Sequence, residues 1–96
     1  MKHFIIEIIF SKPMEAIEKI VPDHRAFLQT GYDKDLLLCS GPLNPRTGGM
    51  VVARAESMEA IQEFFKADPY KLNDVADYRF SEFNPVKFHP ILKDWV

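Results

Sequence analysis

The sequence is poor in several residue types on which small proteins often rely. Its 96 residues include one cysteine, one tryptophan and four glycines. The lone Cys39 excludes an internal disulfide and a thiolate metal cluster, and its apolar neighbours Leu36, Leu37 and Leu38 favour a small buried residue over a nucleophile. No glycine-rich loop with phosphate-binding spacing is present, because Gly48-Gly49 stands in a hairpin, where we expect it to supply a turn with positive φ. The sequence therefore predicts no cofactor site.

Metal, nucleic-acid and membrane partners are also excluded by pattern. The three histidines do not stand at ligand spacing with another histidine, the cysteine or a carboxylate, so we expect no metal site. Twelve basic residues are scattered among fourteen acidic ones, without the dense basic stripe that phosphate binding needs. No apolar run approaches the roughly eighteen residues of a membrane span. The first residues enter a strand pattern without a cleavage site, which predicts a cytoplasmic protein.

The composition is that of one ordinary domain over residues 1–96, with 47% apolar and 27% charged residues. A chain of this length buries only about 60 to 70% of the surface that its unfolded form exposes. The chain therefore has little room for a deep substrate cavity of its own, and we expect an association partner.

Hydrophobic periodicity predicts the first half of the chain as strand, helix and strand. Residues 2–11 alternate with period 2, although Ile5 and Ile9 make the second face mixed. Helical spacing begins near Pro13, is interrupted at Pro22, where the helix kinks or a new segment begins, and resumes to Gly31, a plausible C-terminal cap. Residues 36–40 read as a buried strand.

The second half repeats this order with different signals. Residues 50–55 form a strand that pairs with 36–40 across a turn-rich segment. Ser57 is a good N-cap for a helix that Pro69 ends, and residues 75–83 form the last strand. The aromatic tail beyond this strand could form a short closing helix or pack on a neighbour. The predicted fold is α+β, a ferredoxin-like βαββαβ with a four-stranded antiparallel sheet. Its mixed second face favours burial against a second copy, hence a homodimer or higher homo-oligomer.

Two residues are candidates for chemistry. His24 lies on the inward stripe of the first helix, where a satisfied core histidine and a functional one remain open readings. Asp68, displaced from the helix by Pro69, is either a turn carboxylate or a site residue. At a helix C-terminus it would meet the negative end of the dipole, which a histidine or an arginine could compensate.

The motifs together are similar to those of the YciI-like family, small proteins of the dimeric α+β barrel superfamily. The resemblance rests on segments in the family's order and spacing over about three quarters of the chain: His24-Arg25, Phe27-Leu28, residues 36–43, Gly48-Gly49-Met50, residues 56–60 and Ala67-Asp68-Pro69-Tyr70.

The resemblance implies a ferredoxin-like protomer whose sheet packs face to face with that of a second copy. It also implies that His24 and Asp68 form a His-Asp pair in a small cleft. The chain departs from the family at residues 71–75, where a glycine-containing stretch is usual, and in its longer aromatic tail, so Trp95 or His89 could reshape or cap the pocket.

Such a pair is a proton-transfer device, because a carboxylate that accepts one imidazole N–H leaves the other nitrogen as a base. Relatives of similar fold include muconolactone isomerases and enzymes that eliminate HCl from chlorinated aromatic intermediates. The resemblance thus implies an isomerase, lyase (dehydrochlorinase) or hydrolase acting on a small cyclic or aromatic acid.

Further residues could bind that ligand. Arg25 and Arg46 offer bidentate geometry for a carboxylate, although such residues are more often plain surface residues. Ser40 could donate a hydrogen bond or cap a strand end, and Tyr70 follows in the Asp-Pro motif as a further binding candidate. The competing hypothesis is a non-catalytic dimeric module that binds a ligand or serves as an accessory domain, with His24 and Asp68 as a structural ion pair.

Overall fold

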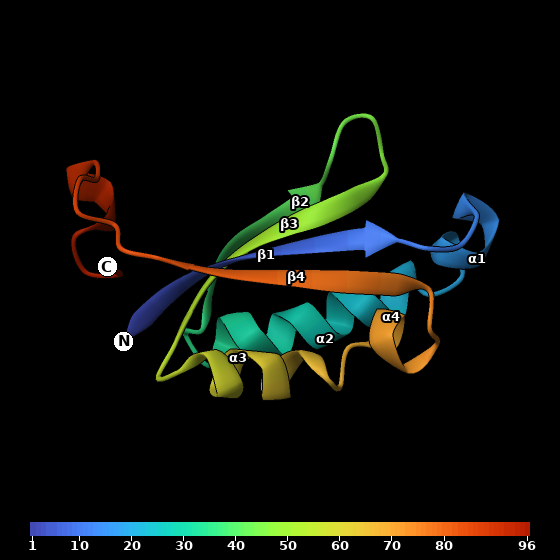
Figure 1. Ribbon diagram of the computed structural model, residues 1–96, viewed down its shortest axis with the longest axis horizontal. Helices are drawn as coiled ribbons and strands as arrows, with labels where there is room; N and C mark the ends of the chain where they lie inside the picture. Colours follow the sequence, from blue (N-terminus) through green and yellow to red (C-terminus); the bar gives the residue numbers. More distant parts are fainter.

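The four strands of the chain form one antiparallel sheet, and the helices between residues 21 and 72 lie on one face of it (Figure 1). A computed structural model describes residues 1–96, with the strand order β2-β3-β1-β4. The strands are β1 (Lys2–Phe10), β2 (Leu37–Pro42), β3 (Gly48–Ala55) and β4 (Ala76–Phe83). The helices are α1 (Met14–Glu18), α2 (Val21–Asp33), α3 (Met58–Phe65), α4 (Pro69–Leu72) and a short 3-10 turn η1 (Pro90–Leu92). The α+β ferredoxin-like fold is as predicted. None of the helices is both long and apolar enough to cross a membrane.

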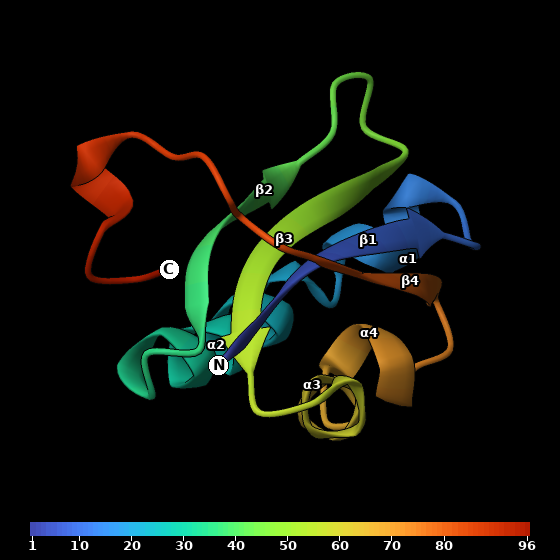
Figure 2. The ribbon, with the colours of Figure 1, turned by 60° about the vertical axis from the view of Figure 1, so that its left-hand side comes forward.

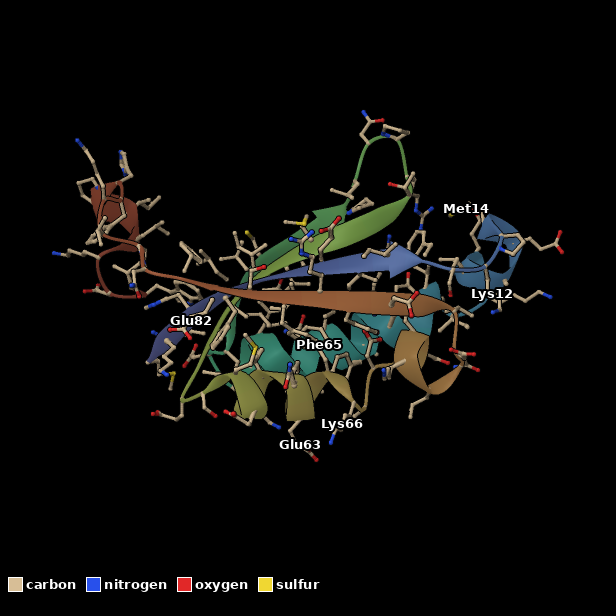
Figure 3. The ribbon with its side chains drawn as sticks, viewed as in Figure 1. Lys12, Met14, Glu63, Phe65, Lys66 and Glu82 are labelled. Atoms are coloured by element: carbon tan, nitrogen blue, oxygen red, sulfur yellow. The ribbon has the colours of Figure 1, made fainter.

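The core lies between the sheet and the helices. The period-2 pattern of β1 turns Phe4, Ile6 and Ile8 toward the helices, where all three are buried. Phe65 of α3 points to the sheet, whereas Glu63 and Lys66 beside it point away (Figure 3). The Ser57 side chain accepts a hydrogen bond from the N–H of Ala60, as expected of an N-cap.

Pro22 belongs to a new helix rather than to a kink. It stands in the first turn of α2, where its missing N–H costs no hydrogen bond. The prediction that Gly31 caps this helix is wrong, because α2 continues to Asp33 and the left-handed residue after it is Asp35, with φ of 59°. Gly31 instead permits close packing: a Cβ there would stand 2.7 Å from Leu37 and 2.8 Å from Phe64.

The prediction that Cys39 is a buried core residue is also wrong. A β-bulge inserts one extra residue into β2, so that Leu37 pairs with Ala53 but Cys39 pairs with the next residue of β3, Val52. Leu37 therefore faces the helices and is buried, while Cys39 is turned to the other face and is exposed.

Gly48 and Gly49 do not form the expected positive-φ turn. Both lie in β3, and no glycine of the chain has a positive φ. A Cβ on Gly48 would collide with the carbonyl oxygen of Ile8 on the neighbouring strand. Glycine is needed here for close backbone approach rather than for a left-handed conformation.

The second face of the sheet is partly covered by the chain's own tail. Trp95 packs beside His3, with ring centroids 5.3 Å apart, and the Arg54 guanidinium donates a hydrogen bond of 2.9 Å to the Trp95 carbonyl. Figure 2 shows the tail on the side of the sheet opposite α3. The tail between β4 and Trp95 remains largely exposed, and Val86 and Ile91 are 89% and 81% accessible.

Candidate functional site

A cavity of about 220 Å³ lies where the start of α2 faces the β2–β3 hairpin and the end of β1. Five of the predicted site residues line it together: His24, Arg25, Ser40, Arg46 and Tyr70. The sixth, Asp68, does not line the cavity, is completely buried and contacts His24. The structure thus brings together residues from α2, the hairpin and α4 that are far apart in the sequence.

Asp68 stands at the N-terminus of α4 and not merely beyond the end of α3. Pro69 occupies the first turn of α4, and the Asp68 side chain accepts a hydrogen bond of 3.1 Å from the N–H of Tyr70. The expected unfavourable contact with a helix C-terminus is therefore replaced by N-capping, in which a carboxylate is favourable.

His24 is held by Asp68 through one ring nitrogen. Its Nδ1 lies 2.7 Å from Asp68 Oδ1, and the pair is buried, with His24 only 7% exposed. Its Nε2 makes no hydrogen bond and is not among the fully buried polar atoms, while the residue lines the cavity. A carboxylate that accepts from Nδ1–H fixes the tautomer in which Nε2 carries the free lone pair. Chemically, this arrangement can accept a proton from a molecule in the cavity.

The Asp68 carboxylate receives two other hydrogen bonds besides that from His24: the Tyr70 N–H on Oδ1 and the Tyr78 hydroxyl on Oδ2, the latter at 2.7 Å. Sequence reasoning missed Tyr78. Its only signal was its place on the helix-facing side of the alternating strand β4. Burial raises the pKa of Tyr78 far above its ordinary value of 10.0, and its hydrogen bond to Asp68 raises it further. The hydroxyl thus stays protonated and donates.

Positive charge dominates the cavity. Arg25 and Arg46 line it, and no aspartate or glutamate does. Burial raises the pKa of the Tyr70 hydroxyl above 10.0; the charges of Arg46 and Arg25 oppose this rise in part, and the Asp68 carboxylate adds to it. Tyr70 therefore offers a hydroxyl donor beside two guanidinium groups. This set of donors suits an anionic ligand.

Ser40 lies on β2 with its side chain toward α2. Its Oγ is 2.6 Å from the hydroxyl of Tyr32, and either oxygen can donate. The residue lines the cavity at the same time, so its hydroxyl can pair with Tyr32 or with a ligand.

The tail does not reach this cavity. The expectation that Trp95 or His89 caps the pocket is wrong, since neither residue lines it and Trp95 packs on His3 instead. The departure at residues 71–75 has a local solution: Asp74 adopts the left-handed conformation, with φ of 54°, in a stretch where a glycine was expected. No cluster of three or more histidine, cysteine or acidic side chains is arranged to hold a metal ion.

Comparisons with known proteins agree with the fold. Among curated proteins no match is found. A similar solved structure is the 5-chloro-2-hydroxyhydroquinone dehydrochlorinase from Burkholderia phenoliruptrix AC1100, in complex with 2,5-dihydroxybenzoquinone. It superposes with a TM-score of 0.73 at 18% sequence identity and covers 85% of this chain and 93% of its own. At this identity the likeness shows a shared fold. The model of the YCII-related domain matches residues 1–84, and the chain therefore belongs to that family.

Proposed function

We propose that this protein is an enzyme in which His24 acts as a general base on a small cyclic or aromatic acid, in a lyase or isomerase type of reaction. The observation that carries the proposal is the His24 ring, with Nδ1 fixed by the buried Asp68 and Nε2 free at a cavity. A base oriented by a carboxylate at a cavity is the usual arrangement for proton abstraction.

The proposed reaction moves one proton to and from His24. His24 Nε2 takes a proton from a carbon or hydroxyl of the ligand, and Asp68 stabilises the imidazolium that forms. In an elimination, the electron pair of the broken C–H or O–H bond forms a new double bond. A leaving group such as chloride departs with the electron pair of its bond to carbon. The imidazolium later returns its proton to solvent. In an isomerisation, the imidazolium returns the proton to a different carbon of the same ligand. Both routes use only residues of this chain.

The proposed substrate class follows from the positive charge of the cavity. Arg25 and Arg46 would hold a carboxylate or phenolate, and the Tyr70 and Ser40 hydroxyls would add hydrogen bonds. A cavity of about 220 Å³ suits a single small ring better than an extended ligand. The solved dehydrochlorinase of similar fold binds a dihydroxybenzoquinone, a six-membered cyclic dienedione, which supports a small cyclic ligand here.

The proposed assembly is a homodimer formed through the second sheet face. Ile9 on this face is 41% exposed, and Ile5, Met50 and Val52 beside it are only half-buried. A second copy would cover these side chains. Light scattering across a concentration series tests the assembly, and a monomer at all concentrations would contradict it.

One observation favours a second candidate, a non-catalytic ligand-binding module. Asp68 joins α2, α4 and β4 through His24, the Tyr70 N–H and Tyr78, so the His-Asp pair also fastens three elements together. A structural ion pair would have the same geometry.

A substitution at His24 separates the two candidates. His24→Gln keeps a polar group of similar length but removes the base, and His89→Gln in the exposed tail is the matched control. Each variant is screened with small lactones, halogenated aromatic acids and chlorinated hydroquinones, after circular dichroism has confirmed its fold. Turnover in the unsubstituted protein and in His89→Gln, with a loss of about 100-fold or more in His24→Gln, is the expected result. A His24→Gln variant that retains turnover would refute the assignment, and ligand binding without turnover in any variant would favour the binding module.

A further inference from the structure

Tyr78 lies outside the cavity and yet contacts the group that holds His24. It stands on β4, on the side facing the helices, with its ring packed against Phe65 and Phe80 at centroid distances of 5.8 Å and 6.1 Å. Its hydroxyl reaches inward and donates to Asp68 Oδ2 over 2.7 Å. The cavity lining does not include Tyr78, so a ligand there would not touch it.

We propose that Tyr78 is a positioning residue that sets the basicity of His24 by holding the Asp68 carboxylate and sharing its negative charge. The inference rests on the proposed role of His24 as the base. Tyr78 acts through Asp68 and makes no hydrogen bond of its own to His24.

The two oxygens of the Asp68 carboxylate have different hydrogen-bond partners. Oδ1 faces the imidazole and the Tyr70 N–H, while Oδ2 accepts from Tyr78. Donors on both oxygens prevent rotation of the carboxylate about its bond to the chain, so Oδ1 stays in line with Nδ1. The Tyr78 hydrogen bond also draws negative charge toward Oδ2. Less charge on Oδ1 means weaker stabilisation of the imidazolium and a less basic Nε2.

Other charged and titratable groups near His24 remain in place when the Tyr78 hydroxyl is removed. Arg25 and Arg46 share the cavity lining with His24, and Tyr70 stacks on its ring. Lys71 of α4 lies over the Tyr78 ring, 5.9 Å from its centroid, and keeps that position if the ring is retained. Tyr78→Phe therefore tests the contribution of the hydroxyl group alone.

The test is a pH titration of the His24 ring followed by NMR, in the full chain and without any ligand. In Tyr78→Phe, the carboxylate charge is no longer shared, and we expect the titration midpoint of His24 to rise by about half a pH unit or more. Tyr32→Phe, which also removes a hydrogen-bonded tyrosine hydroxyl from the chain, should leave the midpoint unchanged. A midpoint that stays or falls in Tyr78→Phe would overturn the proposal.

Two further measurements show that the effect passes through Asp68. In an Asp68→Asn background the charge is absent, so adding Tyr78→Phe should shift the midpoint by much less than in the parent protein. An equal shift in both backgrounds would also overturn the proposal. If Tyr78→Phe does not fold, 3-fluorotyrosine at position 78 keeps the ring and makes its hydroxyl a stronger donor. The expected shift of the His24 midpoint is then downward, and no shift or an upward one refutes the role.

The titration distinguishes this proposal from the proposed function, because it needs no substrate. A shifted midpoint in a protein without turnover would uphold the role of Tyr78 and leave the enzyme unsupported. If turnover depends on His24 but Tyr78→Phe leaves the His24 titration midpoint unchanged, the enzyme is supported and the role of Tyr78 is refuted.

Discussion

The imidazole of His24 and the phenol of Tyr70 lie face to face, with ring centroids 3.9 Å apart and planes inclined by 10°. Asp68 holds the edge of the same imidazole at Nδ1. The ring is therefore held at a face and at an edge, while Nε2 has no hydrogen-bond partner in the chain and the residue lines the cavity.

The stack predicts different effects for two substitutions of Tyr70. Tyr70→Phe retains the ring and should change the free energy of unfolding by less than about 1 kcal/mol, whereas Tyr70→Leu loses the stack and should cost about 1–3 kcal/mol. Urea denaturation measures both. An equal loss in the two variants would mean that the hydroxyl, and not the ring, stabilises this region.

Ser57 and Asp68 are both N-cap residues, and their substitutions can be compared directly. Ser57 caps α3 through a single hydrogen bond, and Ser57→Ala should cost about 1 kcal/mol. Asp68 caps α4 and in addition accepts from His24 and Tyr78, and its side chain is fully buried, so Asp68→Ala should cost about 3–5 kcal/mol. Similar losses in denaturant unfolding would show that the contacts to His24 and Tyr78 contribute little to stability.

Gly31 and Gly41 form a second pair. A methyl group at Gly31 would press on Leu37 and Phe64, and we expect Gly31→Ala to lower the free energy of unfolding by about 1–3 kcal/mol. Gly41→Ala meets nothing within 4 Å and should be neutral or slightly stabilising. Thermal melts of both variants check this, and an unperturbed Gly31→Ala would show that α2 can move away from β2 at little cost.

Alkaline stability should depend on Tyr78. Its folded pKa lies far above the 10.0 of an unfolded chain, so above pH 10 the unfolded state releases a proton that the folded state retains. The free energy of unfolding therefore falls as pH rises beyond 10, by about 1.4 kcal/mol per pH unit from this residue, and the contribution is complete below that pH.

Unfolding curves between pH 9 and 12 test this expectation. Tyr78→Phe lacks the titrating group, so its stability should decline less steeply than that of the unsubstituted protein. The comparison cancels the contribution of the lysines, which both proteins share. Parallel declines would contradict the shift at Tyr78.

Much of the fold could be predicted because alternation and helical spacing are local. The strand pattern of Phe4, Ile6 and Ile8 places the core on one face without knowledge of the tertiary structure. The β-bulge in β2 leaves no comparable signal, so the orientation of Cys39 could not be predicted. The role of Gly31 depends on its approach to Phe64 of α3, a contact that no local pattern encodes.

The candidate site was predictable where motifs marked it. The residue pattern singled out His24 and Asp68 as candidates, and the resemblance paired them. The structure brings His24 Nδ1 to 2.7 Å from Asp68 Oδ1. Tyr78 could not be selected, since an aromatic residue between the exposed Asp77 and Arg79 looks like any other member of an alternating strand. Its hydrogen bond to Asp68 depends on the packing of β4 against α4.

The bulge in β2 has a practical consequence. Because it turns the sole thiol outward beside Val52, a maleimide reagent added to the folded protein would modify one known position on the second face of the sheet. The labelling rate at Cys39 then serves as a built-in probe of occupancy, slow when another molecule covers that face and fast when the face is free.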